Sequence, residues 1–139
     1  MKVRSTFVAL VLFFTSGCAT TPIATNEALD VPRDRVINAS LLVKLDASSV
    51  VVVKRDAGFI GATCTSRVFV NAVPVADLAR GEKVVLYLPE GEHLVGTRAN
   101  GICAGGLSET RASIMKGRTY TFRIGYGSNG EYSIQPTAF

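Results

Sequence analysis

The most constraining feature of this sequence is a series of short apolar runs that begins at Ser49 and is interrupted by Gly, Asn, Pro and Asp. In the run KVVLYLP, Val84, Leu86 and Leu88 alternate with residues of the opposite face. A period of two places one side of a strand on a core and the other toward water, as in antiparallel sheets. About seven or eight such runs predict an all-β fold, a small antiparallel β-sandwich. They cover residues 49–55, 66–71, 73–78, 83–89, 92–99, 107–115, 118–126 and 131–136.

A second pattern precedes these runs. Within residues 33–45, Val36, Ile37, Leu41 and Leu45 fall roughly on one face of a helical projection. This spacing predicts a short helix before the first strand.

The chain opens with a basic and then apolar stretch. Lys2 and Arg4 precede apolar residues 7–14, too few to span a bilayer, which takes about 20. A basic start, a short apolar run and a small-residue exit are typical of a secretory signal. The exit TSGC resembles the bacterial lipobox, and this resemblance implies that Cys18 carries lipid after residues 1–17 are removed. The alternative is an ordinary cleaved signal in which Cys18 is incidental.

The predicted organisation has three parts. Residues 1–17 are a lipoprotein signal peptide, 18–35 are the lipidated Cys and a flexible tether, and 36–139 are one β-sandwich domain. Small, polar and Pro-containing residues after Cys18 favour a tether, and two or more acyl chains make a durable anchor in the bilayer. Because Ala19 rather than Asp follows the cysteine, the resemblance to bacterial lipoproteins implies the outer membrane, facing the periplasm.

The charge of the chain excludes a nucleic-acid partner. The formal net charge is +4, and loss of Lys2 and Arg4 with the signal brings it to about +2. Nucleic-acid binding calls for basic residues clustered on one face, whereas the arginines here are spread along the chain among acids.

The sequence also predicts the chemical state of the three cysteines. If Cys18 carries lipid, Cys64 and Cys103 remain as a pair, and the periplasm permits disulfides. The alternatives are a metal site or a reactive thiol, but a zinc site takes four ligands and His93 is the only histidine. We therefore predict a disulfide, no metal and no cofactor.

The strand and turn motifs resemble a known bacterial module. A valine-rich strand, a Gly turn, a second apolar strand and a P-x-G-x-H turn follow one another, and a G-x-x-Y strand closes the pattern. This order is similar to the PEGA-like module and the related DUF2846 family of small bacterial lipoproteins, over roughly residues 49–136. The resemblance implies a β-fold but no catalytic residues. The matching positions are Val68, Val70, Val75, Leu78, Pro89, Gly91, His93, Gly117 and Tyr120.

Catalytic motifs are sparse. The sequence contains no GxSxG elbow and no phosphate-binding Gly loop with Lys and Ser/Thr. His93 lies in a predicted turn, where a structural role is expected, and the acids Asp77, Glu82, Glu90 and Glu92 lie near turns. We predict that the protein is not an enzyme.

Two Gly-rich loops, residues 57–64 and 100–106, each contain one cysteine and an apolar tip. If Cys64 bonds Cys103, the loops are tied together, and their tips form either a patch for a partner or part of the core. The candidate partner-binding residues are Phe59, Ile60 and Ile102 at the tips, with Arg67 and Arg98 at the rim.

Three functions fit this sequence. The first is a membrane-anchored periplasmic lipoprotein that acts as a non-catalytic binding or accessory module for an envelope protein or a cell-wall component. The second is an inhibitor or immunity-type lipoprotein that blocks a cell-wall-degrading enzyme. The third is an enzyme that acts on the wall. We favour the first because it requires the fewest features that the sequence lacks.

Overall fold

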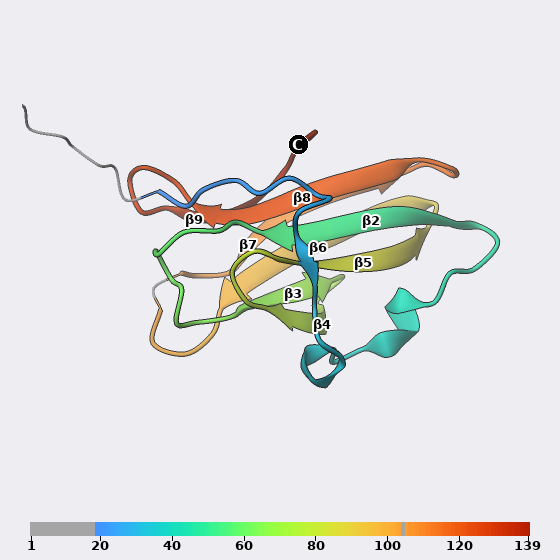
Figure 1. Cartoon of the computed structure of the whole chain (residues 1–139). Helices are drawn as coiled ribbons and strands as arrows, with labels where there is room; N and C mark the ends of the chain where they lie inside the picture. Colours follow the sequence, from blue (N-terminus) through green and yellow to red (C-terminus); the bar gives the residue numbers. More distant parts are fainter. Residues whose placement is uncertain (1–18, 104) are drawn as a thin grey trace, which may run out of the picture.

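A computed structural model describes residues 19–103 and 105–139, and these residues form an all-β structure (Figure 1). Within this part of the chain, nine strands lie in two sheets, and there is no α-helix. The predicted all-β class is therefore confirmed, with nine strands in place of the seven or eight expected. The strands are β1 (Leu29–Asp30), β2 (Ser48–Arg55), β3 (Ser66–Val70), β4 (Val73–Leu78), β5 (Glu82–Pro89), β6 (Gly91–Ala99), β7 (Ser108–Ile114), β8 (Thr119–Tyr126) and β9 (Tyr132–Pro136).

The five-stranded sheet is mixed, in the order β1-β5-β2-β8-β9. Strand β2 pairs antiparallel with β5 but parallel with β8, and β1 runs parallel to β5. The prediction of an entirely antiparallel fold is therefore wrong for this sheet. Alternation of apolar and polar residues reports which face of a strand is buried and carries no information on the direction of its neighbour.

The four-stranded sheet, in the order β4-β3-β6-β7, is antiparallel throughout. Its β3–β4 hairpin turns through two residues with positive φ, Asn71 at 49° and Ala72 at 65°. Two consecutive left-handed residues form a type I′ turn, whose twist matches that of the flanking strands.

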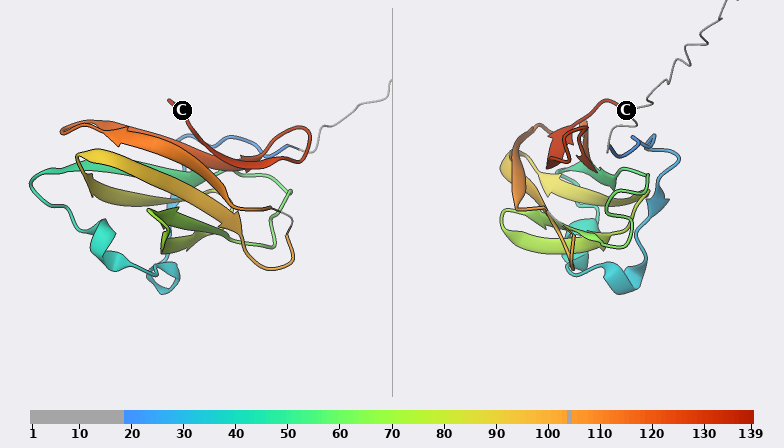
Figure 2. Two further views of the ribbon diagram at one scale, coloured as in Figure 1. Left: turned by 180° about the vertical axis from the view of Figure 1, so that it is seen from behind. Right: turned by 90° about the vertical axis from the view of Figure 1, so that its left-hand side faces the viewer.

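The two sheets share one core (Figure 2). The side chains expected on one face of β5, Val84, Leu86 and Leu88, are fully buried, as are Phe122 and Ile124 of β8. Side chains of β3, β4, β6 and β7 join them in the same cluster. Burying each large apolar side chain contributes roughly 1.5–3 kcal/mol, so this cluster is the main source of stability.

The short helix predicted over residues 33–45 is wrong. Two 3₁₀ turns, Arg33–Arg35 and Ala39–Leu42, are separated by extended residues. Val36 forms a bridge with Ala76, and the N–H of Ile37 donates to the Val75 carbonyl at 2.8 Å. Pairing with the edge of β4 satisfies these backbone groups and prevents a continuous helix.

The segment expected to be a flexible tether lies against the five-stranded sheet. The N–H of Thr20 donates to the Tyr126 carbonyl at 3.0 Å, Thr21 pairs with Ala57, and Leu29–Asp30 extend the sheet beside β5. This differs from the expected tether over residues 18–35. Residues 29–31 satisfy backbone groups along the edge of β5, which would otherwise present unpaired donors and acceptors.

Candidate functional site

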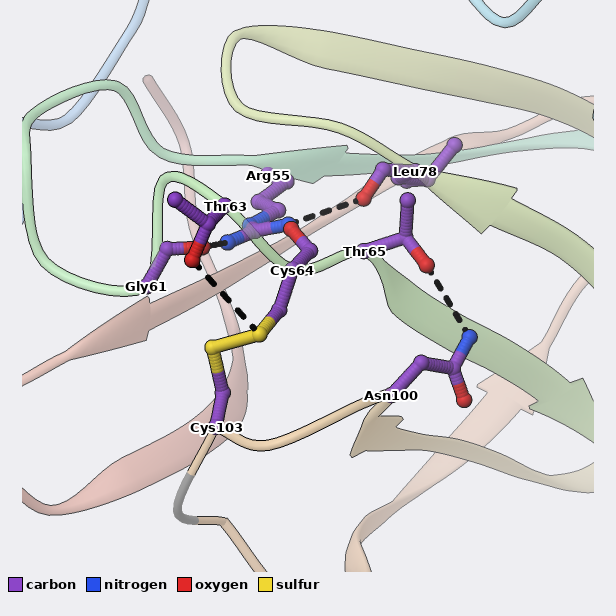
Figure 3. Close-up of a disulfide and its surroundings, with 8 residues drawn as sticks. All are labelled: Arg55, Gly61, Thr63, Cys64, Thr65, Leu78, Asn100 and Cys103. Atoms are coloured by element: carbon purple, nitrogen blue, oxygen red, sulfur yellow. Dashed lines mark hydrogen bonds between the residues drawn. A yellow bond between two sulfur atoms is a disulfide. The ribbon is translucent and has the colours of Figure 1, made fainter.

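The loops that contain the two remaining cysteines meet at one end of the molecule. Cys64 and Cys103 form the predicted disulfide, with their Cα atoms 6.1 Å apart (Figure 3). Beside it, the N–H of Asn100 donates to the Thr65 carbonyl at 2.8 Å, and its side-chain amide donates to Thr65 Oγ1 at 3.0 Å. We call residues 56–65 and 100–103 the stapled loops.

A buried arginine, Arg55, stabilises the first of these loops, residues 56–65, through hydrogen bonds to its backbone. Arg55 is 4% exposed, and its guanidinium donates to the carbonyls of Gly61 (2.5 Å), Leu78 (3.0 Å) and Cys64 (Figure 3). Burial lowers the pKa of Arg55, because a charged group loses solvation in the interior. The three carbonyl oxygens replace the lost water, so the positive charge fixes the loop conformation.

The next residue, Asp56, fixes the N-terminal segment. Its carboxylate is buried, and it accepts hydrogen bonds from the Arg123 guanidinium and from Thr20 Oγ1, the latter at 2.9 Å. A Cβ on Gly125 would lie 2.3 Å from Asp56 Oδ2, so only glycine leaves room for this contact. Thr20 Oγ1 also accepts from the Tyr126 N–H at 3.0 Å.

Lys54, on the opposite side of β2 from Arg55, is buried as well. Its ammonium donates to the Ile23 carbonyl at 2.6 Å, to Thr25 Oγ1 at 3.2 Å and to a main-chain oxygen of Phe139. Burial lowers its pKa. Sequence reasoning missed the roles of Lys54, Arg55 and Asp56. The available signal was three consecutive charges directly after four valines, within one strand and its end.

The apolar tips of the stapled loops are exposed. Phe59 is 89% and Ile102 98% exposed, the highest values among the large apolar side chains that the structure describes, whereas Ile60 is half-buried. The sequence left open whether the loop tips lie at the surface or in the core. The exposure of Phe59 and Ile102 places these two side chains at the surface. The Arg80 guanidinium lies 6.0 Å from the centre of the Phe59 ring.

The two arginines predicted at the rim of the stapled loops, Arg67 and Arg98, make different contacts. Arg67 donates through Nε and Nη2 to Asp77, both at 2.8 Å, and these hydrogen bonds hold the pKa of the Asp77 carboxyl below its usual value. Arg67 is thus engaged within the fold. Arg98 is exposed and lies over the Phe69 ring at 5.9 Å.

His93 lies at the other end of the molecule from the stapled loops and has a structural role there. Its Nδ1 is 3.0 Å from the Asn71 side-chain amide nitrogen, and its Nε2 is 3.0 Å from the Pro89 carbonyl oxygen. Asn71 Oδ1 accepts from the N–H of Leu94, which closes the network. The ring therefore ties the β3–β4 turn to the β5–β6 turn.

No family model matches this chain, and no curated protein matches it. Residues 19–103 and 105–139 contain no helix of the length and apolarity needed to cross a membrane. In the same residues, no three His, Cys, Asp or Glu side chains cluster in a way that could hold a metal ion.

Proposed function

We propose that this protein is a lipoprotein of the bacterial cell envelope, anchored in the membrane through acylated Cys18, whose domain binds rather than catalyses. The opening stretch of the sequence supports the anchor. The Cys64–Cys103 disulfide is compatible with an oxidising compartment such as the periplasm. The outer membrane, facing the periplasm, is the proposed site because Ala19 follows the cysteine.

One observation carries this proposal: the chain joins the domain almost immediately after Cys18. Thr20 makes hydrogen bonds with Asp56 and Tyr126, and two residue steps span at most about 7 Å. A lipid on Cys18 would therefore hold the domain directly on the membrane. A β-sandwich of the PEGA-like type, built from the two packed sheets, is the proposed fold of this anchored domain.

The chemistry of the described residues favours binding over catalysis. His93 is engaged with two turns, and the buried carboxylate of Asp56 is engaged by Arg123 and Thr20. We therefore propose an accessory module, acting on an envelope protein or a cell-wall component without a cofactor.

A second function is favoured by one feature, the protrusion of Phe59 and Ile102 from disulfide-linked loops. An inhibitor or immunity-type lipoprotein would present such loops to the cleft of a wall-degrading enzyme. Purified mature protein would then inhibit a muramidase or an amidase, and replacing both side chains with Ser would abolish the inhibition.

Metabolic labelling with a palmitate analogue tests the anchor. Wild-type protein is expected to take up label and to fractionate with membranes, whereas Cys18→Ser remains unlabelled. A Cys64→Ser/Cys103→Ser variant is the matched control, because it keeps Cys18 and should be labelled like wild type. Unlabelled wild-type protein in the soluble periplasmic fraction would overturn the proposal.

A further inference from the structure

Several loops of the molecule meet at the end that holds the disulfide. The loop after β2, the β4–β5 turn, the loop after β6 and the β8–β9 turn all lie there, beside the first described residues of the chain (Figures 1 and 2). Direct contacts connect them: Thr21 pairs with Ala57, the N–H of Gly81 donates to the Arg55 carbonyl at 3.0 Å, and Cys64 bonds Cys103. We call this the stapled end.

The N-terminal segment contacts the stapled loops themselves. A Cβ placed on Gly58 would lie 3.4 Å from the backbone nitrogen of Thr21 and 3.6 Å from the Cα of Thr20. Phe59, the next residue, is therefore close in space to the point where the chain leaves Cys18. Phe59 and Ile102 project from loops that Arg55 and the disulfide hold in place.

The composition of this end is that of a membrane-contacting surface. Phe59 is an aromatic and Ile102 an aliphatic side chain, and both are exposed to water. Arg80 lies over the Phe59 ring, while Glu131 is the exposed acid of the β8–β9 turn. Two apolar tips, one of them beside an arginine, suit the boundary between acyl chains and anionic headgroups.

We infer that Phe59 and Ile102 insert into the same bilayer that holds the lipid on Cys18, so that the stapled end is the face of the domain that lies on the membrane. This inference rests on the proposed lipidation. With Thr20 fixed on the sheet and at most about 7 Å of chain before it, the anchor keeps this end at the membrane surface. Tethering of this kind makes even weak insertion effective, because the second contact is intramolecular.

A fixed orientation has a consequence for partners. The β3–β4, β5–β6 and β7–β8 turns lie at the end away from the stapled loops and would point into the periplasm (Figure 1). A soluble partner would then meet these turns and the sheet edges, while the stapled loops remain in the lipid.

The chain contains no tryptophan, so a single Trp is an unambiguous reporter. Phe59→Trp and Ile102→Trp place it on the stapled loops, and Leu45→Trp is the matched control, since Leu45 is 65% exposed and lies at the other end, just before β2. Each full mature lipidated variant is reconstituted into phosphatidylethanolamine vesicles with a minority of phosphatidylglycerol, with and without brominated acyl chains. Bromolipid is expected to quench the two loop reporters several-fold more than the control.

The outcomes separate this inference from the proposed function. Equal, weak quenching of all three reporters in protein that does carry palmitate would overturn the inference and leave the anchor intact. Absence of palmitate on Cys18 would overturn the proposed function instead. If the fluorescence emission of the loop tryptophans shifts to the blue in native envelopes but bromolipid does not quench it, a protein covers these loops. This outcome also overturns the inference. Phe59→Ser/Ile102→Ser, changed only at exposed positions, should retain the fold and lose protection of the loop amides from hydrogen exchange.

Discussion

The two ends of this molecule are held together in different ways. At the turn end, defined by residues 71–72, 89–91 and 115–118, strands are joined by short connections, each of which contains at least one residue with positive φ. At the stapled end, longer loops are fixed by groups distant in sequence: a disulfide, the Arg55 guanidinium and the contacts of Thr20. A short turn is stabilised by its own conformation, whereas a long loop depends on contacts elsewhere in the chain.

Removal of the disulfide is expected to have the largest effect. In the chain-entropy model, a crosslink between residues 39 apart contributes about 4 kcal/mol. Cys64→Ala/Cys103→Ala should lower the free energy of unfolding by about this amount, measured by urea denaturation.

Reduction of the wild-type protein with a thiol should reproduce the shift, and the same thiol should leave the double variant unchanged. Hydrogen exchange should increase in the stapled loops and stay slow at the turn end. Uniform loss of protection at both ends would contradict the idea that the ends are held independently.

Arg55→Met is expected to have the second-largest effect. It removes the guanidinium and leaves the carbonyls of Gly61, Cys64 and Leu78 without this donor, and buried polar groups that lose a partner cost about 1–3 kcal/mol each. We expect a loss of about 3 kcal/mol by urea denaturation. The matched control is Arg80→Met, an exposed arginine at the same end, which should change stability by less than about 0.5 kcal/mol. Equal effects of the two substitutions would show that Arg55 does not hold the loop.

Asp77 connects the β3–β4 hairpin to the stapled end, because it accepts from both Arg67 and the side chain of Asn100. Since Arg67 lowers its pKa in the folded state, the stabilisation is complete above the unfolded pKa of about 3.9 and is lost as pH falls through the lower folded value. Asp77→Asn should cost about 1 kcal/mol at pH 7, a modest value because solvent screens the partly exposed Arg67.

Thermal unfolding measured at a series of pH values checks this sign. The difference between wild type and Asp77→Asn should shrink toward low pH, where the wild-type carboxyl becomes protonated. A difference that stays constant from pH 7 to pH 2 would assign the effect to packing rather than to charge.

The sequence predicts some features of this fold and leaves others undetermined. The buried faces of β5 and β8 follow from alternation, because Val84, Leu86 and Phe122 each face the core in the expected register. The disulfide follows once Cys18 is assigned to the lipid, because Cys64 and Cys103 then remain as a pair. Parallel pairing of β2 with β8 does not follow, since the period of a strand is the same in either direction.

The buried charges are the part of the candidate site that sequence reasoning could not find. Charged side chains are almost never fully buried unless partners compensate them, so Lys54, Arg55 and Asp56 would be expected at the surface. Their compensating oxygens and guanidinium come from residues 20–25, 61–64, 78, 123 and 139. Only the three-dimensional arrangement brings these segments together, which is also why the sequence predicted a tether over residues 18–35.

Ala72→Gly is the smallest expected effect, and it tests the turn end alone. Ala72 adopts φ of 65°, a left-handed conformation that costs a residue with a Cβ roughly 1–2 kcal/mol, and Asn-Gly is the preferred pair for a type I′ turn. Glycine also adds entropy to the unfolded chain, which offsets about 0.4–1 kcal/mol. The variant should therefore gain about 0.5 kcal/mol in free energy of unfolding, seen as a small rise in Tm, with no change in hydrogen exchange at the stapled loops.

Because Asn71 binds His93 and the Leu94 N–H, Asn71→Gly should by contrast lose stability although it relieves the same backbone strain. A loss of stability in Ala72→Gly would mean that side-chain packing of Ala72, not its backbone conformation, determines the stability of this hairpin.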